Sequence, residues 1–464
     1  MDHDAKVFMK HALVILRPAS PELSEKPHII ANALVKLRIW TAGLPIDEAT
    51  KFKWQNPAGA VPPPPYAIFF ASTVPWFTIA NAVIANPPGP APNATLKITP
   101  ASVAAGLSVD SRLLLERAFA VCADVHLEAI EEGNSGVSVY RAHAELAQGV
   151  LGKWPQPYFV KIGNRFKIYE EYKIYEERVD PYIPFHLGPH LIRERCCLGA
   201  SKGLIVGDFV EESESLRDCA CQGRAAAAIA CLFDRTLLGW HRSPTKVQVS
   251  ISSGLSACFP RKIDHQRFAR AEALGATHTL SQLRSLFDLC TSEPVLVGPI
   301  HGDLHAANVR VRATDAIVID FFSHRIFPLI YDAASLEASL LVEGFADDQR
   351  SIEEWQHSLE SLYKTSLFDG TLLHPSPKDR SSWFHACVRQ IRRYARQWEC
   401  SDGQYAGALA VALLIKASRD KLVADPEASR RAVAYVFAEK VLVDTFGSAP
   451  SAHNVIESIA RDAP

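Results

Sequence analysis

The sequence lacks an excess of charge of either sign. Its 49 lysines and arginines nearly match its 51 aspartates and glutamates, so the formal net charge is −2. Proteins that bind nucleic acid through its phosphates usually carry a basic excess, so we expect no nucleic-acid partner. With 48% hydrophobic and 22% charged residues, the 464-residue chain has the composition of a globular protein and not of a disordered one.

A secretory signal and a zinc-binding cysteine pattern are also missing. Met1 is followed by Asp2 and His3 rather than by a basic segment and an apolar run, so we expect no secretory signal. The ten cysteines are scattered and do not form the paired clusters of a zinc site. We therefore expect reduced thiols and a cytoplasmic location.

Residues 54–96 lack charged side chains altogether and are rich in proline, including the run Pro62–Pro65. Within them, residues 66–85 are long enough to raise the question of a membrane span, but Pro75 and several polar residues interrupt this stretch. We expect buried strands or a short core helix there, and no stable membrane insertion. Residues 1–98 are predicted to form an accessory N-terminal region of unknown function, and a protein partner bound through it stays open.

After this region the patterns become regular. Either Ser108 or Asp110 is a suitable cap for a helix over residues 111–121. Strand-like runs with one helix among them follow, and helices dominate the second half of the chain. The strand-like runs are 127–131, 136–142, 157–162 and 203–210, and the helical regions are 166–179, 224–238, 279–289, 335–362, 383–398, 405–423 and 428–445. This order predicts an α+β chain with a small sheet part and a larger helical part.

An extended segment in the helical half reads VLVGPIHGDLHAANVRVRATDAIVIDF. It places Asp303 in a loop after a strand, Asn308 shortly after that loop, and Asp320 beyond two short strands. Phosphoryl transfer uses such a set, because one carboxylate orients the attacking hydroxyl while an amide and a second carboxylate hold Mg²⁺ against the phosphates. An acidic turn between two core strands would explain one aspartate, but not this spacing of three groups.

The run from His301 to Asn308, together with the sequence VIDF around Asp320, resembles the aminoglycoside phosphotransferase and choline kinase superfamily. The sequence PLIYDAA at 328–334 is similar to the segment that follows in that superfamily. The resemblance, nearest to a bacterial phosphotransferase-like branch, implies a protein-kinase-like two-lobed fold that uses ATP and Mg²⁺. It also implies that Asp303 is the base, that His301 supports the catalytic loop, and that Asn308 and Asp320 are the metal ligands.

This resemblance implies three parts of the chain: the accessory region 1–98, a small antiparallel β lobe at 99–207 and a helical lobe at 208–464. The small lobe should hold the nucleotide. A turn between two predicted strands contains Gly133, Ser135 and Gly136, whose backbone N–H groups could approach phosphate oxygens. The turn departs from the GxGxxG form, and a plain hairpin turn explains the same residues.

Lys161 lies inside the apolar run YFVKI, where a lysine is usually an edge or surface residue. In the superfamily this lysine contacts the α and β phosphates and pairs with a glutamate on the next helix. At 100° per residue, the apolar stripe of that helix consists of Ile168, Tyr172, Tyr175 and Val179. Glu171 borders this stripe, whereas Glu170 falls on the wet side. We therefore predict an ion pair between Lys161 and Glu171.

The resemblance places an interlobe hinge at residues 207–211, where backbone groups near Asp208 and Val210 would meet the adenine edge; an ordinary loop is the alternative. The expected function is an ATP- and Mg²⁺-dependent phosphotransferase acting on a hydroxyl, with a small-molecule acceptor expected and a protein acceptor still open. The competing hypothesis is a catalytically weak or inactive kinase-like nucleotide-binding or scaffold module of a multi-protein bacterial system. The sequence favours the enzyme, because no group of the catalytic set is missing.

Overall fold

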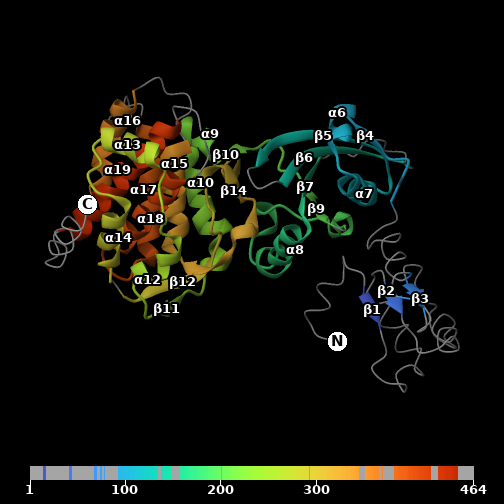
Figure 1. Cartoon of the computed structure of the whole chain (residues 1–464), viewed down its shortest axis with the longest axis horizontal. Coiled ribbons are helices and arrows are strands. Elements are labelled where there is room, and N and C mark those ends of the chain that lie inside the picture. The colour runs from blue at the N-terminus through green and yellow to red at the C-terminus, as the bar shows by residue number, and fades with distance from the viewer. Residues whose placement is uncertain are drawn as a thin grey trace, which may run out of the picture. The chain divides into compact units, whose positions relative to one another are not determined.

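The computed structural model of the chain describes residues 92–447 with gaps, and a few short pieces before them (Figure 1). The gaps are 134–136, 148–156, 200, 292, 344–350, 365–367, 369–380 and 420–426. The chain forms two compact units: Met1–Glu177 with Pro189–Glu211, and Arg178–Gly188 with Glu212–Pro464. The predicted domain boundaries after residues 98 and 207 stay predictions.

Three short strands are described in the N-terminal region. They are β1 (Val14–Leu16), β2 (Thr41–Gly43) and β3 (Ala67–Phe69), and they form a parallel sheet in that order. Of residues 66–85, for which buried strands or a short helix are predicted, the structure describes β3 and residues 74, 75 and 78. The accessory role of this region stays a prediction.

A six-stranded sheet forms the centre of the first unit, with the strand order β4-β5-β6-β7-β9-β8. Figure 1 labels these strands except β8. The strands are β4 (Lys97–Thr99), β5 (Cys122–Gly133), β6 (Val137–Leu146), β7 (Tyr158–Asn164), β8 (Cys197–Leu198) and β9 (Lys202–Asp208). Strand β4 runs parallel to β5, and the other neighbours pair antiparallel. The predicted small antiparallel sheet is therefore confirmed, with the four predicted runs present as β5, β6, β7 and β9.

Helices α6 (Ala101–Gly106) and α7 (Val109–Ala118) come before the long strands. Of the two suitable caps for α7, the structure uses Ser108, whose hydroxyl accepts the N–H of Ser111 at 3.2 Å. Asp110 instead accepts the N–H of Ser201 at 2.8 Å, which fastens the loop before β9. Leu114 is fully buried in the same hydrophobic cluster as the inner face of the sheet, so α7 covers that face.

Helix α8 (Arg165–Ile174) follows β7 and continues as a π-helical turn over Tyr175–Val179. The side chain of Asn164 caps it by accepting the N–H groups of Phe166 and Lys167. All four residues of the predicted apolar stripe are buried, and Glu170 is exposed, so the predicted helical phase is confirmed. Gly203 of β9 permits the close packing, because a Cβ atom there would lie 2.7 Å from Cγ2 of Ile168.

Helices make up most of the second unit, and two small antiparallel sheets accompany them. The helices are α9 (Leu216–Cys221), α10 (Ala225–Cys231), α11 (Leu238–His241), α12 (Ile251–Leu255), α13 (His265–Ala273), α14 (Leu280–Asp288), α15 (Ile330–Glu343), α16 (Ile352–Leu359), α17 (Ser382–Ala395), α18 (Gln404–Ser418) and α19 (Glu427–Phe446). The strand orders are β10-β13-β14, with β10 (Glu214–Ser215), β13 (Val309–Arg312) and β14 (Asp315–Val318), and β11-β12-β15, with β11 (Thr245–Val247), β12 (Val295–Ile300) and β15 (Arg325–Pro328).

The predicted fold class, α+β with a small sheet part and a larger helical part, is confirmed. Some helical regions differ in detail from the prediction: the helix predicted over 111–121 is α7, Val109–Ala118, and the region predicted as 405–423 leaves the helical conformation after Ser418. The region 224–238 is α10 followed by a π-helical turn at Leu232–Thr236, and the region 335–362 contains two helices, α15 and α16. Within the described part of the chain, no helix is both long enough and apolar enough to cross a membrane.

A buried ion pair joins three of the central helices, which lie side by side in Figure 1. Arg392 of α17 donates to both carboxylate oxygens of Glu337 on α15, at 3.0 and 2.6 Å, and Tyr405 of α18 donates to the same carboxylate at 2.8 Å. Removing one partner of such a pair leaves a buried charge and costs about 3–5 kcal/mol. The contact therefore fixes α15 and α18 relative to each other, and the C-terminal ends of both helices contribute to the site described next.

Candidate active site

The loop that follows β12 is held by a buried aspartate. Asp332, in the first turn of α15, accepts the backbone N–H of His301 at 2.7 Å and that of Gly302 at 3.0 Å. Gly302 has φ +82°, and a Cβ atom there would clash with the carbonyl oxygen of Ser323. The chain therefore turns sharply at Gly302, and this turn fixes the backbone from which Asp303 projects.

His301 joins this loop to the segment before Asp320. Its ring is fully buried, its Nε2 lies 3.0 Å from the carbonyl oxygen of Ile319, and its Nδ1 lies 3.4 Å from the N–H of Asp303. Nε2 therefore donates and Nδ1 accepts, so the neutral ring carries its proton on Nε2. The predicted supporting role of His301 stays a prediction, but these bonds suit it and leave neither ring nitrogen for proton transfer to a substrate.

A tight hairpin brings Asn308 and Asp320 to the same end of a pair of strands. Val309 of β13 pairs with Val318 of β14, and one step further the N–H of Ile319 donates to the carbonyl of Asn308 at 2.9 Å. Asp320 follows with φ +66° and an exposed side chain. A non-glycine residue in this left-handed region costs roughly 1–3 kcal/mol, and such strain is typical of functional sites.

The side chain of Asn308 links the hairpin to the loop. It is buried, and its Nδ2 donates to the carbonyl oxygen of Asp303 at 3.1 Å. Because the amide nitrogen is engaged in this way, the amide oxygen points away from that carbonyl. An amide oxygen and the carboxylate of Asp320 are hard oxygen donors, which suit Mg²⁺ completed by water and phosphate oxygens. The residues present therefore fit the metal that the sequence predicts.

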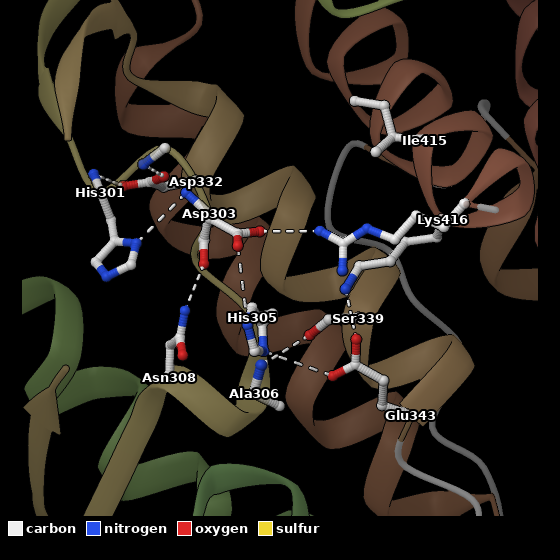
Figure 2. A network of polar contacts seen from close by, with 12 residues as sticks. His301, Asp303, His305, Ala306, Asn308, Asp332, Ser339, Glu343, Ile415 and Lys416 are labelled. Carbon is white, nitrogen blue, oxygen red and sulfur yellow. Dashed lines mark hydrogen bonds and ion pairs between the residues drawn. The ribbon is translucent and has the colours of Figure 1, made fainter. Parts of the chain in front are cut away.

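Charged side chains from the C-terminal ends of α15 and α18 lie to one side of the carboxylate of Asp303 (Figure 2). Arg419, which directly follows α18, places Nη2 3.2 Å from Oδ1 of Asp303, and His305 places Nε2 4.0 Å from Oδ2. The other ring nitrogen of His305 lies 3.8 Å from Glu343, the last residue of α15. Glu343 in turn accepts a 2.5 Å hydrogen bond from Lys416 of α18.

These neighbours set the ionisation of the site. Burial favours the neutral form of Asp303, but His305, Arg419 and Lys416 outweigh it and hold the pKa of Asp303 below its usual range. Burial likewise opposes ionisation of Glu343, and Lys416 outweighs it, so the pKa of Glu343 is also lowered. Asp303 is therefore a carboxylate at neutral pH, able to accept a hydrogen bond from a hydroxyl group.

In the first unit the structure contains the ion pair between Lys161 and Glu171. The Nζ of Lys161 on β7 lies 2.8 Å from Oε1 of Glu171 on α8, and the two side chains are 10% and 13% exposed. Lys161 is thus a buried residue of the sheet and not an edge residue. Its role in nucleotide binding stays a prediction.

The other predicted nucleotide contacts are placed only in part. Gly133 ends β5 opposite Val137, whereas Ser135 and Gly136 lie outside the described residues. Asp208 ends β9, and its N–H donates to the carbonyl of His190 at 2.9 Å, so this N–H is already engaged. The roles of Gly133, Asp208 and Val210 stay predictions.

Four residues near Asp303 were not found from the sequence: His305, Glu343, Lys416 and Arg419. His305 lies inside the recognised motif, and its position two residues after Asp303 could have indicated that it lies near that carboxylate. The other three come from the C-terminal ends of two helices, far along the chain from Asp303. No local pattern marks them, because α15 and α18 bring them to the loop only through tertiary packing.

Comparisons with known proteins find similar solved structures but no matching family and no matching curated sequence. No family model matches the chain, and no curated protein matches it. The solved structures similar to it include the amicoumacin kinase hAmiN (12% identity, TM-score 0.39, 71% of this chain and 91% of that one). They also include a thermostable mutant of aminoglycoside phosphotransferase APH(4)-Ia (12%, 0.43, 74% and 100%) and a choline/ethanolamine kinase family protein from Mesorhizobium loti (11%, 0.32, 72% and 92%).

Proposed function

We propose that this protein is an ATP- and Mg²⁺-dependent phosphotransferase that phosphorylates a hydroxyl group of a small molecule. The observation that carries the proposal is the placement of Asp303, Asn308 and Asp320 around one tight loop and hairpin. Hydrogen bonds within the protein, which involve Asp332 and His301, hold this arrangement. Such prior positioning is the main source of catalysis in phosphoryl transfer, where the protein takes little part in the covalent chemistry.

Each site residue of the second unit, Asp303, Asn308 and Asp320, would have its own role in the reaction. The acceptor hydroxyl would donate its hydrogen bond to the carboxylate of Asp303, and its proton would pass there as its oxygen bonds to the γ-phosphorus. The bond between that phosphorus and the bridging oxygen to the β-phosphate would break, and ADP would leave. Asn308 and Asp320 would hold Mg²⁺, which would neutralise charge on the β- and γ-phosphates.

The first unit would bind the rest of the nucleotide. Lys161, oriented by Glu171, would contact the α and β phosphates. The turn with Gly133, Ser135 and Gly136 would offer backbone N–H groups to phosphate oxygens. The segment from Asp208 to Val210 would meet the adenine through backbone groups. A cytoplasmic location would supply the ATP.

The test is a screen for transfer of labelled γ-phosphate from ATP to hydroxyl compounds in the presence of Mg²⁺. Asp303→Asn, which keeps the size of the side chain, serves as the blank. Asp288→Asn serves as the matched control, because Asp288 is a carboxylate of the same unit that pairs with Arg284, one turn earlier on the surface of α14. We expect acceptor-dependent transfer that survives in Asp288→Asn and is lost in Asp303→Asn. Binding of MgATP without transfer to any acceptor would contradict the proposal.

A further inference from the structure

The most exposed cation at Asp303 is Arg419. Its side chain is 42% exposed, and Nη2 lies 3.2 Å from Oδ1 of Asp303, which is itself 37% exposed. The residue follows the last turn of α18, whose position is fixed through the buried contact of Tyr405 with Glu337. A guanidinium group therefore lies on the carboxylate oxygen that, under the proposed function, faces the acceptor hydroxyl.

The remaining charges near Asp303 compensate one another. Lys416 is only 3% exposed and donates to Glu343, so its charge is matched there. His305 lies between Asp303 and Glu343, within 4.0 Å of each, and burial lowers its pKa. Both carboxylates at this place thus have cationic partners, and neither is left to attract a positively charged ligand. Among the described cations around Asp303, the guanidinium of Arg419 is the one most open to solvent and ligand, since Lys416 is 3% and His305 is 20% exposed.

This arrangement has opposite consequences for acceptors of different charge. An amino or quaternary ammonium compound that approaches Asp303 meets Arg419 first, and it must displace a cation already paired with the carboxylate. A carboxylate or phosphate instead matches the planar fork of a guanidinium and can accept two parallel hydrogen bonds from it. Arg419 can therefore exchange Asp303 for an anionic ligand, and this exchange frees Oδ1 for a hydroxyl hydrogen.

We propose that Arg419 selects the acceptor and that the acceptor is a hydroxyl compound carrying a carboxylate or phosphate group. The inference rests on the proposed function, because it assumes that Asp303 faces the acceptor. On binding, the oxyanion of the acceptor takes the guanidinium, and the hydroxyl group takes the vacated oxygen of Asp303. Arg419 is then a specificity-determining residue, because its ion pair with Asp303 is exchanged for one with the acceptor.

Binding is tested first, because it does not require turnover. Two sets of compounds share a skeleton and differ in charge: glycerol, glycerate, glycerol 3-phosphate and 3-amino-1,2-propanediol, and glucose, glucuronate, glucose 6-phosphate and glucosamine. Each compound is titrated into the full-length protein with MgATP analogue present, and the guanidinium NMR signal of Arg419 is followed. The signal is assigned by its loss in Arg419→Lys. Comparison of the carboxylate and phosphate members identifies which oxyanion the site prefers.

We expect a saturable shift of the Arg419 signal with anionic members, and none with the neutral or cationic members of the same skeleton. Loss of one charge-assisted contact should weaken the binding of these anions in Arg419→Gln by about 10- to 100-fold. Arg261→Gln is the control, because Arg261 is an exposed arginine in the loop before α13. Absence of binding by every anionic member, equal binding by the cationic members, or unchanged affinity in Arg419→Gln would overturn the inference.

Turnover then separates this inference from the proposed function. For an anionic acceptor, Arg419→Gln should raise the acceptor KM by about 10- to 100-fold and leave the KM for ATP unchanged. Transfer by the native protein to the cationic or neutral members of a set and not to the anionic ones would overturn the inference while the phosphotransferase stands. Failure of the native protein to bind MgATP would overturn the proposed function itself.

Discussion

Replacing Glu171 by Gln removes one charge of the proposed nucleotide site with little change of side-chain shape. The variant keeps an oxygen near Lys161 but removes the charge that holds the ammonium group at 2.8 Å. Both side chains are nearly buried, so water replaces the lost contact poorly. A hydrogen bond between charged groups contributes about 1.5–3 kcal/mol, which corresponds to about a 10- to 150-fold change in an equilibrium. We expect kcat/KM for ATP to fall within that range, because Lys161 would no longer be oriented toward the phosphates.

Glu170→Gln is the matched control. Glu170 is the preceding residue of the same helix and is exposed, so its substitution should change the free energy of unfolding by no more than about 0.5 kcal/mol. Steady-state kinetics with varied MgATP and thermal melts of both variants complete the comparison. Equal losses in the two variants, or a larger loss in Glu170→Gln, would refute the assignment of Glu171 as the partner of a phosphate-binding lysine.

Three further changes test other parts of the structure. Asp320→Ala should weaken binding of MgATP severely, because the metal ion that compensates the phosphate charge would lose one of its protein ligands. Equal MgATP affinity of the variant and the native protein in calorimetry would show that Asp320 is not a metal ligand. Gly302→Ala should lower the free energy of unfolding by more than about 1 kcal/mol and reduce transfer, because the added Cβ meets the carbonyl of Ser323. Denaturant titration measures the first effect and a transfer assay the second. Native stability and native transfer in this variant would contradict the tight turn. Burial against Trp398 lowers the pKa of His241 to about 4, so the unfolded chain, with a histidine pKa near 6.5, binds the proton more readily. The free energy of unfolding should therefore carry no penalty from His241 above about pH 6.5 and should fall by up to about 3 kcal/mol between there and pH 4. Denaturant titrations at several pH values should show a smaller fall in His241→Phe. An equal fall in the variant and the native protein would contradict the burial of His241 as the cause.

The partner of Lys161 was predictable because the relevant information is local. Helical periodicity places Glu171 beside the stripe of Ile168 and Tyr172, and the strand and the helix are joined directly at Asn164. Because this connection is so short, a carboxylate on the inner face of the helix has to lie close to Lys161. The loop that carries Asp303 and the hairpin between Asn308 and Asp320 were predictable for the same reason, because they are continuous in sequence.

The residues that surround Asp303 could not be found in this way. Glu343 and Arg419 reach the loop because α15 and α18 end near it, and this depends on helix lengths and on the buried contact of Glu337 with Arg392. Periodicity reports which face of a helix is buried, but not which distant group faces its last turn.

The cap of α7 also depended on a distant contact. Ser108 and Asp110 are equally good caps locally, and the choice follows from the hydrogen bond between Asp110 and the loop at Ser201.

Asp303, in the proposed function, serves transfer of phosphate and not binding of nucleotide. The most direct test measures both quantities in Asp303→Ala: the Kd for MgATP by calorimetry, and the rate of labelled phosphate transfer to an acceptor found in the screen. Because the carboxylate matters mainly in the transition state, we expect the Kd to stay within a few-fold of the native value while most of the transfer is lost. Transfer at the native rate in Asp303→Ala would contradict the account.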